Sequence, residues 1–263
     1  MKRTRILGKD REIGYRQWIA PAPRAVFLLV HGLGAHTGRW EFLADFFLAH
    51  GISSYAIDLR MAAGFGSYYS DIIRFRDKID KENPSLKIFL VGESMGALVS
   101  FLLVAARPGL FSGLVCISPA FANRMKLPAS DYLKIFASLF YDPGKEFRLP
   151  FDSSMCTRDI EYRKKMNADS AERRSSPSRI LAGILISQVR ARFAGSSLRT
   201  PALFLVAGRD LMIDHRATKE IFQGLPVKDK TLIEYPEMYH ALSIDIGKEK
   251  VFEDMLKWVE ERL

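Results

Sequence analysis

The sequence predicts an α/β fold, in which a doubly wound parallel sheet is covered by helices. Short runs that are apolar on both faces recur along the chain, as expected of strands buried in a central parallel sheet. Amphipathic stretches with helical spacing alternate with these runs. The length of 263 residues corresponds to one large domain, or to one domain with an insertion.

The elements follow one another in a regular order. The expected strands are the runs 25–30, 53–58, 87–91, 113–118, 202–207 and 230–235. The expected helices are 40–50, 68–81, 94–106, 215–222 and 252–263. Gly51 is a candidate C-terminal cap for the first helix, because glycine adopts the left-handed backbone conformation without strain. The third helix stops before the turn-forming pair Pro108 and Gly109.

The alternation of strands and helices is interrupted between residues 121 and 199. This segment has no convincing strand, and it offers two helices, 131–141 and 178–190, separated by loops rich in Pro, Asp and Ser. We therefore expect a core domain formed by 1–120 and 200–263, with a helical cap formed by 121–199. The segment holds 15 Lys or Arg and 8 Asp or Glu, so its net charge of +7 makes up most of the chain's +9.

The composition is that of a globular protein, with 48% hydrophobic and 26% charged residues, which excludes a disordered, collagen-like or low-complexity chain. The charge of +9 favours an anionic partner, such as a nucleic acid, an anionic membrane or an acidic substrate. Cys116 and Cys156 are too few for a disulfide framework and are expected to be buried free thiols in a reducing compartment. The charged N-terminus lacks a signal peptide's apolar stretch, and no apolar run reaches the roughly 20 residues of a membrane span. We therefore expect a cytoplasmic protein.

A Gly-x-Ser-x-Gly motif lies at Gly92, Ser94 and Gly96. It follows the expected strand 87–91 and opens the expected helix 94–106, which is the strand–turn–helix setting of a nucleophile elbow. The two glycines leave room where a tight turn brings neighbouring backbone close. Ser94 is therefore the candidate nucleophile. The alternative is a tight turn in which Ser94 only caps the helix.

A serine nucleophile needs a base, and an acid that orients the base, because its hydroxyl is barely ionised at neutral pH. Asp210 and His240 each follow a late strand, so both would project at the sheet edge that carries Ser94. We expect His240 to take the Ser94 proton and Asp210 to hold the imidazole. Asp214 is the rival acid, but it is also a natural N-cap of the helix that follows. The other histidines occupy positions that favour solvation over catalysis; they are His31, His36, His50 and His215.

The oxyanion of a tetrahedral intermediate needs hydrogen-bond donors. One expected donor is the backbone N–H of Met95, directly after the candidate nucleophile. The other is the backbone N–H of Leu33, in the glycine-rich loop that follows the first strand. A lone His-Gly-x-Gly sequence is as often a plain tight turn, so this assignment depends on the other site residues.

Five segments together are similar to those of a known family. Residues 31–40 read His-Gly-Leu-Gly-Ala-His-Thr-Gly-Arg-Trp, and 92–96 read Gly-Glu-Ser-Met-Gly. With the acid segment 208–214, the base segment 239–240 and the phrase 156–161, they resemble the monoacylglycerol lipase and lysophospholipase branch of the α/β-hydrolases. This branch is also grouped with the serine aminopeptidases. The resemblance implies an eight-stranded, mostly parallel sheet with a helical cap inserted before the late strands. It also implies hydrolysis of lipid carboxylic esters without a cofactor.

The sequence departs from that family pattern at three places. Residues 61–67 replace the family's usual Gly-His-Gly and Ser, in a shortened loop. Ala97 stands where the elbow usually has a second glycine, and Ala35 stands where an acidic residue often follows. None of these positions belongs to the expected triad, but all three could reshape the pocket.

The two expected helices of the 121–199 segment carry more apolar residues than one buried stripe requires. Packing against the core is one explanation. The other is an acyl-chain tunnel, together with a basic surface that meets anionic lipid head groups. In that case the candidate substrate-binding residues are Gly32, Phe136, Leu139 and Ile184. The expected function is hydrolysis of single-chain lipid esters, such as monoacylglycerol or lysophospholipid, through an acyl-enzyme and with loose membrane contact.

Two other classes of function stay open. A thioesterase, amidase or aminopeptidase would use the same triad, and a non-catalytic ligand-binding protein could share the fold. The basic clusters 163–165 and 173–174 lack interleaved aromatic residues, so nucleic acid is not an expected partner. The histidines lack the spacing of metal ligands and the cysteines lie far apart, so we expect neither a metal nor another cofactor.

Overall fold

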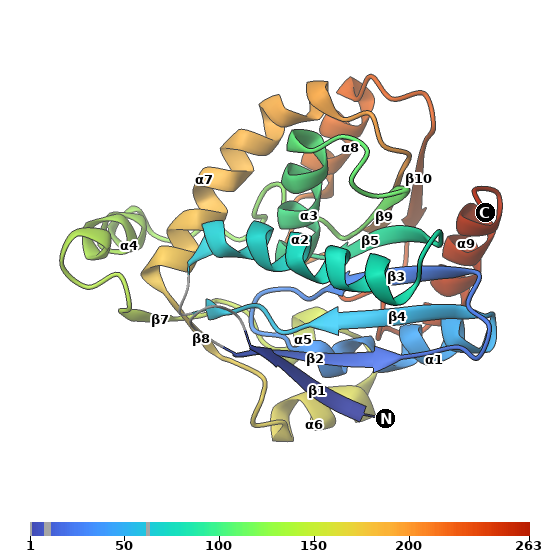
Figure 1. Ribbon diagram of the computed structural model, residues 1–263. Coiled ribbons are helices and arrows are strands. Elements are labelled where there is room, and N and C mark those ends of the chain that lie inside the picture. The colour runs from blue at the N-terminus through green and yellow to red at the C-terminus, as the bar shows by residue number, and fades with distance from the viewer. Residues whose placement is uncertain (1, 8–11, 62–63) are drawn as a thin grey trace.

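The sheet has eight strands in the spatial order β1-β2-β4-β3-β5-β6-β9-β10 (Figure 1). The computed structural model describes residues 2–7, 12–61 and 64–263. The strands are β1 (Lys2–Leu7), β2 (Glu12–Trp18), β3 (Ala25–Val30), β4 (Ile52–Ile57), β5 (Lys87–Glu93), β6 (Gly113–Ile117), β9 (Ala202–Ala207) and β10 (Lys230–Tyr235). β2 runs antiparallel to β1 and β4, and the other neighbouring pairs are parallel. The mostly parallel sheet is thereby confirmed.

All strands that were predicted from apolar runs occur close to their predicted positions. The same pattern does not predict β1 and β2. In β2, the buried residues Ile13 and Tyr15 alternate with the partly exposed residues Gly14 and Arg16. A strand that is covered on one face alternates apolar and polar residues, so it does not form a continuous apolar run.

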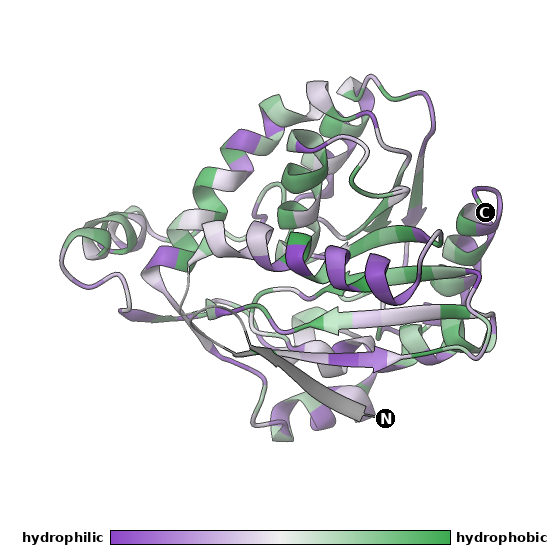
Figure 2. Cartoon of the chain, viewed as in Figure 1, coloured by the Kyte–Doolittle hydropathy of each residue, from purple (hydrophilic) through white to green (hydrophobic). Residues whose placement is uncertain are grey.

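Helices cover both faces of the sheet (Figure 1). One face carries α2 (Phe65–Glu82), α3 (Met95–Ala106) and α8 (His215–Gly224), and the other carries α1 (Glu41–Ala49) and α9 (Lys248–Glu260). Within β3, Val26 and Leu28 face α2 and α3, whereas Phe27 faces α1. Figure 2 shows the hydrophobic residues gathered on the central strands and α3. Gly51 ends α1 with a φ of 72°, as its predicted capping role requires.

The segment 121–199 lies between β6 and β9, as predicted, but it is not purely helical. It contains α4 (Ala129–Tyr141), β7 (Glu146–Arg148), α5 (Ser153–Cys156), α6 (Ile160–Ala168), β8 (Ser175–Pro177), α7 (Ser178–Ala194) and a 3₁₀ turn, Gly195–Ser197. β7 and β8 form a small antiparallel sheet, so the prediction that this segment has no strand is wrong. Each strand has three residues, which is too short to produce a recognisable pattern.

The 121–199 segment lies beside the carboxyl ends of the parallel strands. Figure 1 shows α4, β7 and β8 beyond the sheet edge toward which β4 points. α7 packs against both α3 and α4, so it joins the segment to the helical layer on one face of the sheet. The division into a core, 1–120 with 200–263, and a cap stays a prediction.

Several further expectations concern the chain as a whole. Ala62 and Ala63 of the shortened loop, and residues 1 and 8–11 of the N-terminus, lie outside the described residues. Cys116 and Cys156 are both buried and free, as predicted. Of the helices formed by the described residues, none has the length and apolar character needed to cross a membrane.

Candidate active site

Ser94 occupies a strained turn between β5 and α3. Its φ of 56° and ψ of −118° are unusual for a residue other than glycine, and such backbone strain is typical of functional sites. A Cβ at Gly92 would lie 2.5 Å from the Gly96 carbonyl oxygen, and one at Gly96 would lie 2.1 Å from the Val30 carbonyl oxygen. Both positions therefore require glycine. The Ser94 side chain makes no capping hydrogen bond to α3, which excludes the interpretation of Ser94 as a plain helix cap.

Asp210 and His240 form a buried hydrogen-bonded pair. The Oδ2 of Asp210 lies 2.7 Å from the Nδ1 of His240, and the two residues are only 2% and 4% exposed. The Oδ1 of Asp210 accepts the backbone N–H groups of Met212 and Ile213 at 2.8 and 2.9 Å. One carboxylate oxygen is thus held by the backbone, while the other holds the imidazole.

Electrostatics link the two members of this pair. Burial lowers the pKa of His240, but the charge and hydrogen bond of Asp210 outweigh it, so the pKa is raised overall. Burial raises the pKa of Asp210, but His240 and two backbone N–H groups outweigh it, so that pKa is lowered overall. Asp210 is therefore ionised at neutral pH and stabilises a proton on His240.

The second ring nitrogen of His240, Nε2, is available to accept a proton. This nitrogen is buried and has no hydrogen-bond partner among the described residues. His240 and Ser94 line the same cavity. Because Asp210 fixes a proton on Nδ1, Nε2 is left as the ring nitrogen that can accept a proton, in a residue that lines one cavity with Ser94.

Asp214, the rival acid, lies outside this arrangement. Its carboxylate accepts the backbone N–H of Arg216 at 3.1 Å, so it caps the N-terminus of α8. It also forms an ion pair with the exposed Arg216 side chain. The structure therefore gives Asp214 the capping role that its position predicts.

The expected oxyanion donors lie beside Ser94. The backbone N–H groups of Leu33 and Met95 both lack a hydrogen-bond partner among the described residues. Leu33 and Met95 line one cavity with Ser94. A Cβ at Gly32 would lie 3.1 Å from the Ser94 Cβ, so the glycine-rich loop passes directly over the serine. Two unpaired N–H groups at this place could bind a developing oxyanion.

His31 supports the glycine-rich loop through hydrogen bonds to backbone groups, a role that the sequence did not indicate. The backbone N–H of Leu59 donates to its Nε2 at 3.0 Å, so the proton of the neutral ring is on Nδ1. Nδ1 then donates to the Gly32 carbonyl oxygen at 2.8 Å. Burial lowers the pKa of His31, which keeps the ring neutral and preserves both bonds.

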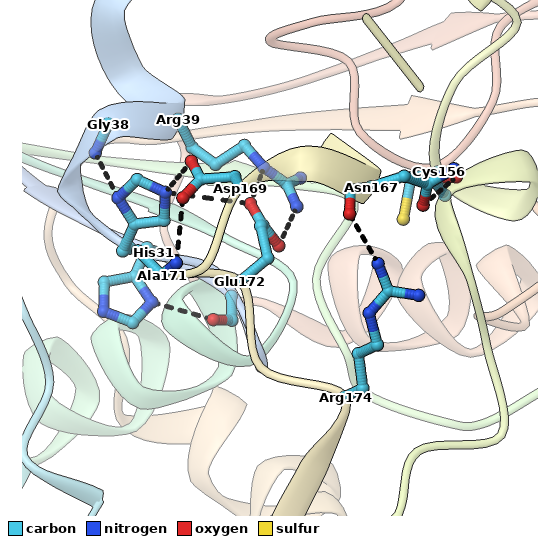
Figure 3. Close-up of polar contacts among 12 residues, drawn as sticks. His31, Gly38, Arg39, Cys156, Asn167, Asp169, Ala171, Glu172 and Arg174 are labelled. Carbon is cyan, nitrogen blue, oxygen red and sulfur yellow. Dashed lines mark hydrogen bonds and ion pairs between the residues drawn. The ribbon is translucent and has the colours of Figure 1, made fainter. Parts of the chain in front are cut away.

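The 121–199 segment holds the same loop from the other side. The Arg39 guanidinium donates to both oxygens of Glu172, at 2.8 and 2.7 Å (Figure 3). The backbone N–H of Arg173 donates to the Gly34 carbonyl oxygen at 2.8 Å. His36 lies 3.0 Å from Asp169 through its Nε2. Residues 169–173 therefore contribute to the shape of the candidate oxyanion loop.

A second set of contacts ties this segment to the loop of His240. The backbone N–H of Ala241 donates to the Cys156 carbonyl oxygen at 2.9 Å. Asp245, which is fully buried, accepts from the Thr157 hydroxyl at 3.0 Å and from the Arg158 backbone and side chain at 2.7 and 2.9 Å. It also accepts the backbone N–H of Tyr239 at 2.8 Å. The family-like phrase 156–161 therefore anchors the candidate base.

Two cavities meet at Ser94. The larger, about 380 Å³, is lined mostly by apolar side chains from α4, α7 and the loops beside them, and its size is that of a ligand pocket. The smaller, about 100 Å³, has arginine and carboxylate side chains in its lining and lies between the glycine-rich loop and residues 148–174. We call them the apolar chamber and the polar chamber. Both are lined by Leu33, Ser94, Arg148, Leu149, Phe151 and Met212.

The four predicted substrate-binding residues divide into two groups. Ile184 lines the apolar chamber and Gly32 lines the polar chamber. Phe136 lines neither, and faces a separate surface groove, while Leu139 is half-buried outside both chambers. For these two the structure corrects the prediction, because the face of α4 that turns inward carries Ile135 instead.

The described residues contain no cluster of three or more His, Cys, Asp or Glu side chains that could hold a metal ion. His36 lies near two carboxylates, at 3.0 Å from Asp169 and 4.0 Å from Glu172. The contacts of His36 connect the loop after β3 with the loop between α6 and β8.

Known proteins resemble this chain over most of its length. The family pattern described as serine aminopeptidase, S33, matches residues 21–247. The monoglyceride lipase of Homo sapiens is 28% identical over 260 residues, which cover 91% of this chain and 84% of that lipase. The phospholipase YtpA of Bacillus subtilis is 27% identical, covering 89% of this chain and 95% of its own. The crystal structure of the Paleococcus ferrophilus monoacylglycerol lipase superposes with a TM-score of 0.89 at 23% identity, covering 96% and 100% of the two chains.

The mostly parallel sheet, flanked by helices on both faces, has the architecture of an α/β-hydrolase. The chain belongs to the serine aminopeptidase S33 family. Within this family it falls in the monoacylglycerol lipase and lysophospholipase branch, and it is a serine hydrolase of carboxylic esters.

Proposed function

We propose that the protein hydrolyses single-chain lipid esters, such as monoacylglycerol or lysophospholipid, through a Ser94–His240–Asp210 triad and an acyl-enzyme. The observation that carries this proposal is the meeting of the two chambers at Ser94. An acyl chain in the apolar chamber places its ester carbonyl at Ser94 and its alcohol part in the polar chamber. The names of the human lipase and the Bacillus subtilis phospholipase agree with such substrates.

The chemistry follows from the roles of the side chains. His240 Nε2 takes the Ser94 proton as the hydroxyl attacks the ester carbonyl, and Asp210 stabilises the imidazolium that forms. The backbone N–H groups of Leu33 and Met95 bind the oxyanion. His240 then protonates the leaving alcohol. In the second half of the reaction His240 takes a proton from water as the water attacks the acyl-enzyme, and it returns that proton to the Ser94 oxygen as the acid is released.

Covalent labelling tests the nucleophile. A fluorophosphonate probe is expected to label the wild-type protein and to leave Ser94→Ala unlabelled. Equal labelling of the two proteins, or no labelling of the wild type, would remove the proposal and favour a non-catalytic binding protein. Hydrolysis of p-nitrophenyl esters of increasing chain length, measured beside acyl-CoA and aminoacyl substrates, separates an esterase from a thioesterase, amidase or aminopeptidase.

We propose in addition that the 121–199 segment acts as a cap that touches lipid surfaces. Phe140 and Leu133 of α4 are 92% and 72% exposed, and Phe193 of α7 is 73% exposed. Figure 2 shows α4 as a largely hydrophobic helix at the edge of the molecule. Exposed large apolar side chains near a strongly basic segment favour peripheral contact with an anionic membrane.

A further inference from the structure

The polar chamber is lined by four arginines and three carboxylates. Its lining includes Arg39, Arg148, Arg173 and Arg174, with Glu93, Asp152 and Glu172. Arg39 is paired with Glu172, and Arg173 with Glu146. Arg148 and Arg174 have no carboxylate partner among the described residues. These two arginines are therefore the guanidinium groups of the lining that are in no ion pair among the described residues.

Arg148 and Arg174 lie at the paired ends of β7 and β8, where Arg174 immediately precedes the first residue of β8. Arg148 ends β7 and lies opposite Ser175 of β8, and the backbone N–H of Leu149 donates to the Arg174 carbonyl oxygen at 2.9 Å. The Arg148 side chain is exposed and lines both chambers. The Arg174 side chain donates one bond, at 3.0 Å, to the Asn167 carbonyl oxygen (Figure 3). A guanidinium has five N–H groups, so both arginines keep most of their donors.

Asn167 adds a neutral donor to this side of the chamber. Its Oδ1 accepts the Ser153 hydroxyl at 3.0 Å, which orients the side-chain amide. The amide Nδ2 has no acceptor among the described residues, and Asn167 lines the polar chamber. Two further carboxylates line the chamber: Asp152 accepts the backbone N–H of Ser154 at the start of α5, and Glu93 accepts the Ser243 hydroxyl.

We propose that the polar chamber binds a phosphate group on the alcohol part of the substrate, with Arg148 and Arg174 as its ligands and Asn167 as a further donor. This inference rests on the proposed function, since it requires the ester carbonyl at Ser94. Arginine matches the geometry of phosphate oxygens through paired N–H groups. A phosphate can accept charge-assisted hydrogen bonds from both guanidinium groups, whereas the hydroxyl groups of a neutral glycerol carry no charge that pairs with them. The preferred substrate class is therefore a single-chain lysophospholipid.

The test compares two short-chain esters at concentrations where both are monomeric, decanoylglycerol and decanoylglycerol 3-phosphate. The variants are the double substitution Arg148→Gln with Arg174→Gln, and a control, Arg190→Gln with Arg192→Gln. The control removes the same charge from α7, where neither arginine lines a chamber. Melting temperatures check that both variants fold.

The wild type is expected to cleave the phosphate-bearing ester with a kcat/KM about tenfold or more above that of the neutral ester, because charge-assisted hydrogen bonds are of that strength. In the chamber variant the ratio of kcat/KM for the phosphate-bearing ester to that for the neutral ester is expected to fall to about one, while the control variant keeps the wild-type ratio. Equal wild-type rates on both esters, or equal losses in the two variants, would overturn the head-group assignment alone. Absence of hydrolysis of both esters would overturn the proposed function and this inference with it.

An inhibition experiment separates a lipid head group from free phosphate. Glycerol 3-phosphate is expected to inhibit wild-type hydrolysis of p-nitrophenyl decanoate at concentrations at which inorganic phosphate and glycerol do not. The chamber variant is expected to be insensitive to all three. Equal inhibition by inorganic phosphate and glycerol 3-phosphate would mean that the chamber binds free phosphate, which contradicts the head-group assignment.

Discussion

The Oδ2 of Asp210 lies 2.7 Å from the Nδ1 of His240, and neither residue is more than 4% exposed. Because the backbone N–H groups of Met212 and Ile213 hold the other carboxylate oxygen, Asp210 has one available orientation. That orientation fixes the ring of His240, and with it the direction of Nε2. Asp210 is therefore the side chain that orients the imidazole of His240.

Substituting the two neighbouring aspartates in the same way tests this dependence. Asp210→Asn is expected to lower kcat by about 10⁴, because the amide no longer stabilises the His240 cation or its tautomer. Asp214→Asn is expected to leave kcat near the wild-type value, since asparagine caps a helix as well as aspartate does. Its ion pair with Arg216 is exposed and contributes little. Steady-state hydrolysis of a p-nitrophenyl ester measures both, and similar losses in the two variants would contradict the assignment.

The pH dependence of kcat/KM tests the electrostatics of His240. The base must be neutral to accept a proton, so activity is expected to rise with pH as His240 deprotonates. Although burial lowers the pKa of His240, Asp210 and Glu93 raise it, so the rise is expected above the ordinary histidine range near 6.5. Burial raises the pKa of Glu93, and at pH values where this carboxyl is ionised Glu93→Gln removes a negative charge beside His240, so the rise is then expected to move to lower pH. Glu237→Gln, a change at an exposed ion pair, is the control. An unmoved profile in Glu93→Gln would contradict the coupling.

The sequence predicted the site residues whose positions follow from the order of strands and helices. Ser94, Asp210 and His240 come after or at the ends of β5, β9 and β10, and the carboxyl ends of parallel strands meet at one sheet edge, so their proximity could be expected from the order of elements. The residues that hold the site's loops in place could not be predicted from the order of elements. His31 and Asp245 act through bonds to backbone groups distant in sequence, and no local pattern encodes such partners.

The small sheet of the 121–199 segment illustrates the same limit in the fold. Arg148 and Ser175 are paired in β7 and β8, yet neither strand has an apolar run or an alternating pattern. Phe136 and Ile135 are adjacent and both apolar, and only the packing of α4 decides that Ile135 faces the chamber. Periodicity identified the helix but not which part of its apolar surface is buried.

The glycines of the elbow should tolerate no side chain. In Gly96→Ala the new Cβ would lie 2.1 Å from the Val30 carbonyl oxygen, which is backbone and has little freedom to move. We expect a loss of about 3 kcal/mol or more in unfolding free energy, at or above the upper end of about 1–3 kcal/mol for overpacked sites. Gly66→Ala is the matched control, because no atom lies within 4 Å of the place that a Cβ would take there, in the first turn of α2. It is expected to stabilise the protein by about 0.5–1 kcal/mol. Urea unfolding measures both changes, and equal effects would show that the elbow is less crowded than the distances indicate.

Asp245 is expected to be the most sensitive of the ionised groups that hold the His240 loop. Asp245→Ala leaves Arg158 and two backbone N–H groups without their acceptor in a buried place, which typically costs about 3–5 kcal/mol. Glu161→Ala removes an ion pair in which both side chains are exposed, and the change is expected to stay within about 0.5 kcal/mol. Denaturant titration gives both values. A cost for Asp245→Ala as small as that of Glu161→Ala would mean that the loop is held mainly by packing.

Membrane contact through α4 makes a prediction that separates binding from folding. Leu133→Gln with Phe140→Gln changes two side chains that are 72% and 92% exposed, so the unfolding free energy is expected to stay within about 0.5 kcal/mol. Sedimentation with anionic vesicles at low salt is expected to fall by a factor of several, because apolar area no longer enters the interface. Ile160→Gln is the control, since Ile160 is 64% exposed but lies on α6, away from α4 (Figure 1).

The composition of the vesicle supplies the second half of that test. If the basic groups of the 121–199 segment contribute, wild-type binding is stronger to anionic than to neutral vesicles and weakens as salt screens the charges. The Leu133→Gln, Phe140→Gln variant keeps all of these basic groups, so its remaining binding should keep the preference for anionic lipid. Equal wild-type binding to anionic and neutral vesicles at low salt would contradict the electrostatic contribution. A loss with Ile160→Gln as large as that of the double variant would contradict the choice of α4.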